Sequence, residues 1–176
     1  CACKVCTSSD PRDQRTRPSL MLEYDGRVVV IDTTPDFRQQ ALREKIMRLD
    51  AVIFTHYHAD HVLGLDDTRV FYFRQQVPLP IYADDSTMAT LRQVFAYVFE
   101  QTYKYGGIGK FDARRIDGAF TLGGLEFKPV PVMHGDLPVL GFRFGSAAYV
   151  TDFSTIPAPS LELLQNLDVL ILDALR

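Results

Sequence analysis

The stretch AVIFTHYHADH, residues 51–61, decides how the rest of the chain is interpreted. Its first five residues are mostly apolar or β-branched, which is typical of a buried strand. Four side chains that can bind a metal follow directly: His56, His58, Asp60 and His61. Residues i and i+2 of an extended segment point the same way, so His56 and His58 can share one metal ion. A helix that starts next can turn Asp60 and His61 toward a second ion.

The grouping of the histidines, rather than any single one, favours metal binding. A lone histidine is usually a surface residue, or a core residue with hydrogen-bonding partners. Here three of the four histidines in the chain fall within six positions. Neutral imidazoles packed this closely have little structural use, so the pattern indicates a metal site.

Two further candidates follow predicted strands farther along the chain. His134 ends the second arm of a predicted hairpin, and Asp152 follows a predicted strand over residues 147–151. Each has an ordinary alternative, because a strand-end aspartate commonly caps a turn and a single histidine commonly has only a structural role. Beside the HYHADH motif, three strand ends that deliver histidines or a carboxylate predict a metal site at one rim of a sheet.

Apolar periodicity and turn signals predict a mixture of strands and helices. Helices are predicted over residues 36–50 and 157–166, a helix or part-helix over residues 59–74, and a further helix capped by Asp84 or Asp85. Strands are predicted over residues 27–32, 51–55, 81–83, 139–144, 147–151 and 168–173. A hairpin is predicted over residues 120–133, with Pro129 and Pro131 pushing its second arm toward a sheet edge, and residues 103–110 are predicted as a loop. Strands outnumber helices, which favours an α+β fold of face-to-face sheets with helices outside over a doubly wound parallel sheet.

Length and composition limit the classes to which the chain can belong. A chain of 176 residues predicts one domain, residues 1–176. A hydrophobic share of 47% and a charged share of 23% exclude a disordered tail, a fibre and a coiled coil. The net charge of −3 disfavours broad binding to nucleic acid or anionic membranes. The longest apolar stretches have strand length and no signal-peptide pattern is visible, so we expect a cytoplasmic protein without membrane spans.

All three cysteines, Cys1, Cys3 and Cys6, lie within the first six residues, in the pattern C-x-C-x-x-C. A disulfide framework needs cysteines spread along the chain, so this pattern excludes one. Three thiolates on one tight turn can bind one Zn²⁺ and leave its fourth position to a histidine or cysteine elsewhere. Free surface thiols and lipidation of Cys1 are the alternatives. The chain starts inside this motif without a methionine and stops soon after a predicted strand, so we expect a partial chain that lacks elements at both ends.

The order of these motifs resembles that of the metallo-β-lactamase superfamily: HxHxDH, then a strand-end histidine, then a strand-end aspartate. The resemblance implies an αββα sandwich with two metal ions at the edge of the sheets. The implied ligands are His56, His58 and His134 for the first metal, Asp60 and His61 for the second, and Asp152 as a bridge between the two. The superfamily supplies one more histidine to the second metal, and this chain has no fifth histidine.

The N-terminal motifs resemble those of one group within this superfamily. C-x-C-x-x-C, with Asp10-Pro11-Arg12 and IDTTPD at residues 31–36, resembles the group of the carbon–phosphorus lyase accessory phosphodiesterase and its relatives. In that group the three cysteines bind a structural zinc, whose fourth ligand is a histidine near the C-terminus. Asp32 resembles a residue that supports a ligand histidine, with a turn cap as the alternative.

Departures from neighbouring families also inform the function. Metallo-β-lactamases proper place a cysteine in the second metal site, and no cysteine lies beyond residue 6, which argues against antibiotic hydrolysis. Glyoxalase-II-like thioesterases lack the cysteine cluster. The tRNA 3′-processing nucleases hold their substrate with a basic, glycine-rich arm, for which residues 103–115 are a short and mildly basic candidate.

The resemblance implies a metal-dependent hydrolase, and we expect a phosphodiesterase for small cyclic or nucleotide-like phosphodiesters that uses a hydroxide bridging two metals. Asp60, Asp152 and Asp32 are the candidate catalytic residues. The expected cofactors are two divalent ions, zinc or manganese, and one structural zinc at the cysteines. A tRNA-processing nuclease, a thioesterase and a non-catalytic metal-binding domain are the alternatives. The expected partner is a small phosphodiester; nucleic acid is not favoured, no membrane is expected, and a homodimer stays open.

Overall fold

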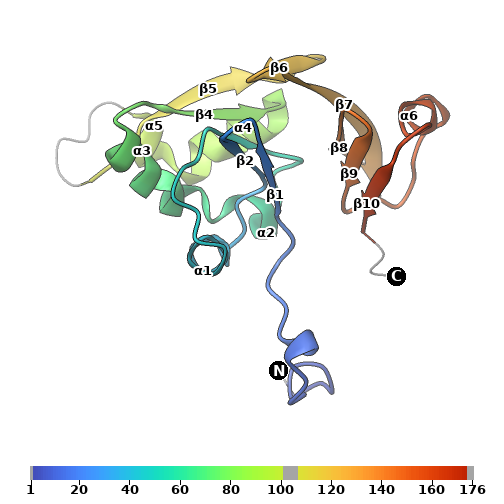
Figure 1. Ribbon diagram of the computed structural model, residues 1–176, viewed down its shortest axis with the longest axis horizontal. Helices are drawn as coiled ribbons and strands as arrows, with labels where there is room; N and C mark the ends of the chain where they lie inside the picture. Colours follow the sequence, from blue (N-terminus) through green and yellow to red (C-terminus); the bar gives the residue numbers. More distant parts are fainter. Residues whose placement is uncertain (1, 101–106, 174–176) are drawn as a thin grey trace.

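Two five-stranded sheets face each other in the computed structural model, which describes residues 2–100 and 107–173 (Figure 1). The first sheet comes from the N-terminal part of the chain. In spatial order its strands are β1 (Leu20–Tyr24), β2 (Arg27–Ile31), β3 (Ala51–Ile53), β4 (Leu79–Ala83) and β5 (Phe111–Arg115). β1 pairs antiparallel with β2, and the remaining neighbours pair in parallel.

The second sheet follows in the chain and is mostly antiparallel, with one parallel pair, β9 and β10. In spatial order its strands are β10 (Val169–Leu172), β9 (Ala147–Val150), β8 (Leu137–Phe144), β7 (Leu125–His134) and β6 (Phe120–Leu122). β6 and β7 form the predicted hairpin. Because β6 covers only Leu125–Phe127 of β7, Pro129 and Pro131 lie where β7 pairs with β8 alone, which confirms their predicted edge position.

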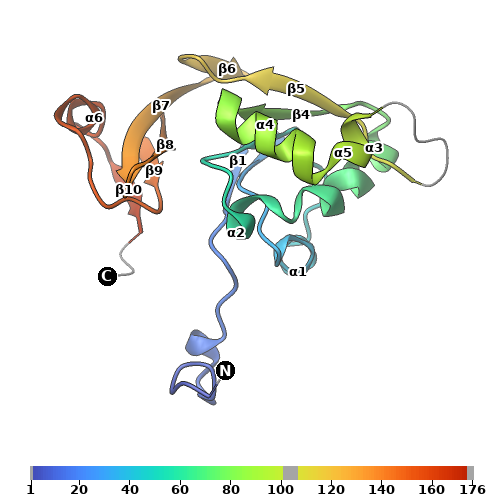
Figure 2. The same cartoon turned by 180° about the vertical axis from the view of Figure 1, so that it is seen from behind.

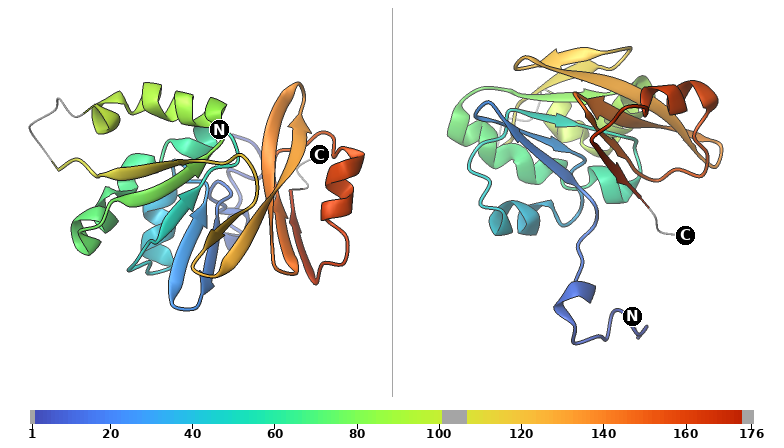
Figure 3. Two further views of the ribbon diagram at one scale, coloured as in Figure 1. Left: turned by 90° about the horizontal axis from the view of Figure 1, so that it is seen from above. Right: turned by 45° about the vertical axis from the view of Figure 1, so that its right-hand side comes forward.

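Helices cover the outer faces of both sheets. The helices are α1 (Phe37–Arg43), α2 (Ala59–Val62), η2 (Leu65–Thr68), α3 (Arg69–Gln75), α4 (Asp85–Val94), α5 (Ala96–Phe99) and α6 (Ala158–Leu163), and η1 (Pro11–Asp13) lies in the N-terminal segment away from both sheets (Figure 1). Seen from behind, α1, α3, α4 and α5 lie on the side of the first sheet that faces away from the second (Figure 2). α6 lies on the outer side of the second sheet, so the layers follow the expected αββα order (Figure 3).

Alternation along β2 explains how one strand serves two cores. Val29 and Ile31 point to the middle of the sandwich, where they join buried residues of the second sheet such as Phe127 and Phe142. Val30, between them, points to the outer face and packs with the residues of α1, α3 and α4. The central core is rich in aromatic side chains, and Phe120 stacks on Phe127 with ring centroids 5.5 Å apart.

Three predicted elements differ from the structure. The helix predicted over residues 36–50 ends at Arg43, because Lys45 adopts a φ of +53° and turns the chain so that Leu49 is buried. The helix or part-helix predicted over residues 59–74 is broken into α2, η2 and α3. Residues 111–115, part of the candidate arm, form β5 beside β4. Of that candidate arm, residues 101–106 lie outside the described part of the chain.

Besides β5, one more strand was not predicted from the sequence. β1 was not predicted, although its residues alternate between half-buried and exposed positions. Within residues 2–100 and 107–173, no helix combines the length and apolar character that a membrane span requires.

Gly64, between α2 and η2, is where the metal-ligand motif packs against the loop after β2. Its amide donates to the Thr33 carbonyl at 2.9 Å. A Cβ at this position would collide with the Thr34 carbonyl oxygen and lie 2.7 Å from the Cβ of Phe37. We therefore predict that Gly64→Ala lowers the free energy of unfolding by about 1–3 kcal/mol, measured by thermal or urea denaturation.

Gly118→Ala is the control for this experiment. A Cβ at Gly118 meets no atom within 4 Å, and this glycine does not have a positive φ. We expect this variant to change stability by less than about 0.5 kcal/mol. Equal stability of the two variants would contradict the close approach at Gly64.

Candidate metal centre

The predicted ligands meet at the end of the sandwich where strands of both sheets terminate. His56 and His58 follow β3 in the first sheet, and the short helix α2 carries Asp60 and His61. From the second sheet, His134 is the last residue of β7 and Asp152 follows β9. Asp152 has a φ of +49°, which bends the chain out of the strand direction at the point where its carboxylate is needed.

Two sets of side chains lie close enough to bind metal ions. One set is His56, His61 and Asp152, and the other is His58, His134 and Asp152; in each set the ligand atoms lie within 4.8 Å of one another. The imidazoles gather closely, with ring centroids 4.2 Å apart for His56 and His61 and 5.3 Å apart for His58 and His134. Asp152 belongs to both sets, as a bridging carboxylate would.

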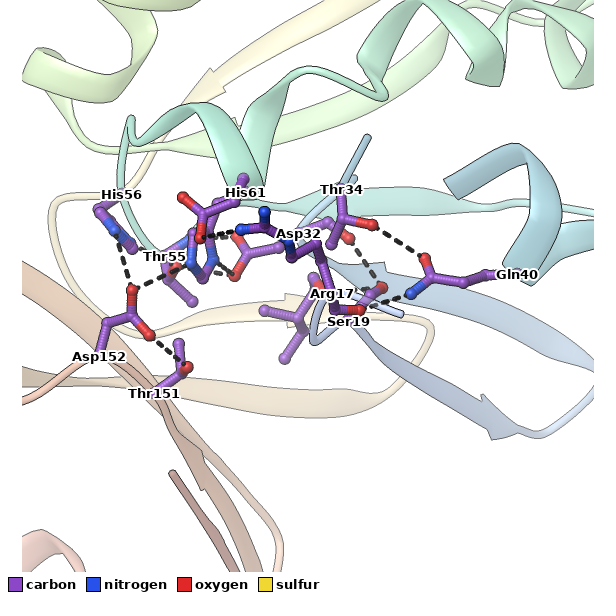
Figure 4. Close-up of polar contacts among 12 residues, drawn as sticks. Arg17, Ser19, Asp32, Thr34, Gln40, Thr55, His56, His61, Thr151 and Asp152 are labelled. Atoms are coloured by element: carbon purple, nitrogen blue, oxygen red, sulfur yellow. Dashed lines mark hydrogen bonds and ion pairs between the residues drawn. The ribbon is translucent and has the colours of Figure 1, made fainter. Parts of the chain in front are cut away.

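An unpaired nitrogen shows that the residues fit a cation. His56 is 1% exposed, and its Nε2 is buried without a hydrogen-bond partner. This atom faces the Asp152 Oδ2 at 3.7 Å, while the His61 Nε2 lies 3.1 Å from the same oxygen (Figure 4). Imidazole nitrogens and a carboxylate oxygen converging in this way are the donor set that zinc, manganese and iron accept.

Burial and the close neighbours shift the pKa values of the side chains at the site. Burial lowers the pKa of His56 to about 3, and the positive charge of His61 adds to the effect. Burial alone would also lower the pKa of His61, but hydrogen bonds to Asp152 and Asp32 outweigh it and raise the value to about 10. The hydrogen bond from His61 lowers the pKa of Asp152 to about 2. Asp152 is thus ionised and His56 neutral, as metal ligation requires, whereas His61 carries an additional proton that a metal ion bound there would displace.

Asp32 lies behind the ligands, away from the open side of the site. It is completely buried, and its Oδ2 lies 2.8 Å from the Nδ1 of His61 (Figure 4). Burial raises the pKa of Asp32, and the hydrogen bonds from His61 and Thr55 oppose this shift. This is the geometry of a residue that supports a ligand histidine, and a direct contact with substrate is not available to it.

Asp60 does not join either set of ligands. Its carboxylate lies 3.4 Å from the Nη1 of Arg17, whose side chain is 60% exposed. The loop before β1 is held in place by Gln40, whose Nε2 donates to the Arg17 carbonyl at 2.6 Å, and by Asp36, which accepts from the Arg17 amide at 2.8 Å. The assignment of Asp60 and His61 to a second metal, and of His56, His58 and His134 to a first, stays a prediction.

The cysteines lie in an exposed turn at the far end of the N-terminal segment, which runs away from both sheets (Figures 1 and 3). The amide of Cys6 donates to the Sγ of Cys3 at 3.3 Å, and hydrogen bonds from Cys6 lower the pKa of the Cys3 thiol. Cys1 lies outside the described residues. Within the described part of the chain, Cys3 and Cys6 belong to no set of metal-competent side chains, so their zinc site stays a prediction.

Two contacts of the site were not expected from the sequence. Thr55, which directly precedes His56, places its hydroxyl between Asp32 and that histidine. Arg17 reaches Asp60 across 43 positions of the chain. Adjacency to the metal-ligand motif could have pointed to Thr55, whereas nothing in the sequence relates Arg17 to Asp60.

Removing Asp152 tests whether it serves both sets of ligands. We predict that Asp152→Ala weakens binding of both metal ions by more than the roughly 10–100-fold that loss of an outer hydrogen-bonding partner costs. His134→Ala should weaken only one, because His134 belongs to a single set. Elemental analysis after dialysis against fixed free Zn²⁺ measures both effects. Equal losses in the two variants would contradict a shared carboxylate.

The zinc site expected at the cysteines can be tested separately. Cys3→Ser should remove one zinc ion per chain and lower the melting temperature, because a structural zinc contributes folding energy. The metal ions at the histidines should remain bound. Unchanged zinc content would contradict the structural site, and lost activity at unchanged stability would instead indicate catalytic thiols.

Comparisons with known proteins agree with this geometry. A family model described as the β-lactamase superfamily domain matches residues 27–176. A crystal structure described as a new diphosphatase from the PhnP family is 50% identical and superimposes with a TM-score of 0.91, covering 100% of this chain and 68% of that one. The human short-form tRNase Z, at 17% identity and a TM-score of 0.68, shares the fold.

Curated relatives carry two different names. An octanoyltransferase of Porphyromonas gingivalis is 40% identical over 178 residues, which is all of this chain and 36% of that protein. A ribonuclease Z of Bradyrhizobium diazoefficiens is 28% identical over 152 residues, or 81% of this chain and 48% of that protein. The chain thus spans between a third and a half of the length of these relatives. On the family match and the resemblance to the PhnP-family structure, the chain belongs to the metallo-β-lactamase superfamily and has its relatives around the PhnP family.

Proposed function

We propose that this chain forms the catalytic domain of a metal-dependent phosphodiesterase that acts on small cyclic or nucleotide-like phosphodiesters in the cytoplasm. The observation that carries the proposal is the pair of histidine sets that share the Asp152 carboxylate. The relative at 50% identity, described as a diphosphatase, supports cleavage of a phosphorus–oxygen bond. Two divalent ions held at this site would stabilise the negative charge that develops on the phosphoryl oxygens.

The residues of the chain supply the remaining parts of such a site. Asp152 and the histidines would hold the cations at the rim, while Asp32 contacts His61 from behind. Arg17 adds an exposed guanidinium beside Asp60, where it can pair with a phosphate oxygen of the substrate.

A small substrate fits the structure better than tRNA. Of the basic residues in the candidate arm, Arg114 and Arg115 lie on β5, within the first sheet, where Arg114 pairs with Asp112 at 2.7 Å and Arg115 with Asp85 at 3.0 Å. Neither extends from the body as an RNA-binding arm would. The octanoyltransferase name belongs to a protein of which this chain covers only 36%, so we do not extend it to this domain.

We predict metal-dependent hydrolysis of bis(p-nitrophenyl) phosphate and of 2′,3′-cyclic nucleotides in the presence of Mn²⁺ or Zn²⁺. Asp60→Ala and His58→Ala should each abolish turnover without unfolding the protein. His58→Ala removes a member of one ligand set, and Asp60→Ala removes the carboxylate that the family resemblance assigns to the second metal; neither change removes core packing. Initial rates measure the activity, and circular dichroism the fold. Asp67→Ala, at an exposed position of η2, is the control and should keep the wild-type rate.

Other substrates test the alternatives. A diphosphate-linked nucleotide determines whether the anhydride is preferred over the diester. Preference for precursor tRNA over small diesters would favour a nuclease. Robust thioester cleavage without diester cleavage would contradict the phosphodiesterase.

A further inference from the structure

The hydroxyl of Thr55 lies between a buried carboxylate and a histidine of the metal centre. Thr55 is 1% exposed and follows β3 directly before the metal-ligand motif. Its Oγ1 lies 2.8 Å from the Oδ2 of Asp32 and 2.9 Å from the Nδ1 of His56. Its backbone amide donates to the other carboxylate oxygen, Asp32 Oδ1, at 2.8 Å.

Counting protons fixes the direction of these hydrogen bonds. Three donor groups converge on Asp32: the amide and hydroxyl of Thr55 and the Nδ1 of His61. The Thr55 hydroxyl has one proton to share between the Oδ2 of Asp32 and the Nδ1 of His56, and the carboxylate oxygen is the stronger acceptor of the two. The single hydroxyl proton of Thr55 is therefore donated to Asp32. Its oxygen then accepts from His56, whose proton must sit on Nδ1.

The position of this proton determines the state of the other ring nitrogen of His56, Nε2. With the proton on Nδ1, the Nε2 of His56 carries a free lone pair. That atom is buried, has no hydrogen-bond partner, and faces the Asp152 carboxylate at 3.7 Å. A proton there would satisfy the carboxylate and exclude a metal ion, whereas a lone pair is what a metal ligand requires.

We propose that Thr55 is a positioning residue that links Asp32 to His56. Its hydroxyl donates to the Asp32 carboxylate and accepts from the Nδ1 of His56, so that one buried carboxylate sets the tautomer of two metal-binding histidines. Asp32 holds His61 directly and His56 through the Thr55 hydroxyl. The two histidines so fixed are those that form one ligand set with Asp152. This inference rests on the metal site of the proposed function and adds to it the residue that prepares His56 for the metal.

The two hydrogen bonds of the Thr55 hydroxyl, called the relay below, predict what happens when only this hydroxyl is removed. Thr55→Val keeps the shape of the residue and leaves its backbone bonds in place, including the bond that the Thr55 carbonyl accepts from the Leu140 amide at 3.0 Å. It removes only the hydroxyl, so the Nδ1 of His56 loses its acceptor. Thr55→Ser restores a hydroxyl at the same position.

The experiment measures metal affinity and the tautomer of His56. Affinity for Zn²⁺ is determined by competition with a chromophoric chelator, and the tautomer by the ¹⁵N shifts of the imidazole in the metal-free protein. We expect Thr55→Val to weaken the affinity about 10–100-fold and to shift His56 toward the form with the proton on Nε2. Thr55→Ser should recover most of the affinity and the wild-type tautomer.

Thr87→Val is the matched control. Thr87 is also 1% exposed, and its hydroxyl is buried without a hydrogen-bond partner, but it lies on α4. This variant should leave both measurements unchanged. If it weakened the metal as much as Thr55→Val does, loss of a buried threonine hydroxyl in general would explain the effect and the relay would be overturned.

The wild-type protein keeps the proposal falsifiable even if Thr55→Val fails to fold. A proton on Nε2 of His56 in the metal-free wild type overturns the relay, and so does wild-type affinity in a folded Thr55→Val. The proposed function fails separately: a protein with the expected tautomer and affinity that hydrolyses no phosphodiester would refute the phosphodiesterase and leave the relay supported.

Discussion

The buried carboxylate of Asp32 is the constraint on which the rest of the site depends. A carboxylate that is completely buried is costly unless hydrogen-bond donors surround it. Here the donors come from the residue before the metal-ligand motif and from its last histidine, so the charge can be buried only when the motif lies in place. Asp32 itself has a φ of +64°, a conformation that aspartate tolerates better than most residues. The strand end, the turn and the orientation of the histidines thus form one cooperative arrangement.

The second requirement is that the two sheets keep their spacing. The first sheet supplies His56 and His61, and the second supplies His134 and Asp152. The Leu140 amide of β8 donates to the Thr55 carbonyl at 3.0 Å, which ties the sheets together beside the site. The aromatic core between the sheets sets the distance over which this bond forms. Residues that touch no metal therefore determine whether a carboxylate of one sheet reaches imidazoles of the other.

The chemistry common to such a site does not by itself select a substrate, because related folds host many reactions. Selectivity has to come from groups around the rim. Arg17 is such a group, since it is exposed and reaches the motif from the loop before β1. Arg114 and Arg115 lie on β5 within the first sheet and form no separate basic arm. This placement of the charges supports the proposed small phosphodiester.

Local patterns in the sequence were sufficient for the metal-ligand motif, the hairpin at Gly123-Gly124, the edge prolines of β7 and the sandwich class. Each depends on residues close together in the chain, or on a period that reports burial on one face. The short α1 and the breaks after α2 were not predictable in this way, because packing of Leu49 and close approach at Gly64 override helix propensity. The partners of Asp32 lie 23 and 29 positions away, and Asp152 lies 91 positions from His61. Sequence alone therefore determined which side chains are able to bind a metal, whereas the tertiary structure decided which of them meet, since only the packed sheets bring these distant groups within hydrogen-bonding distance.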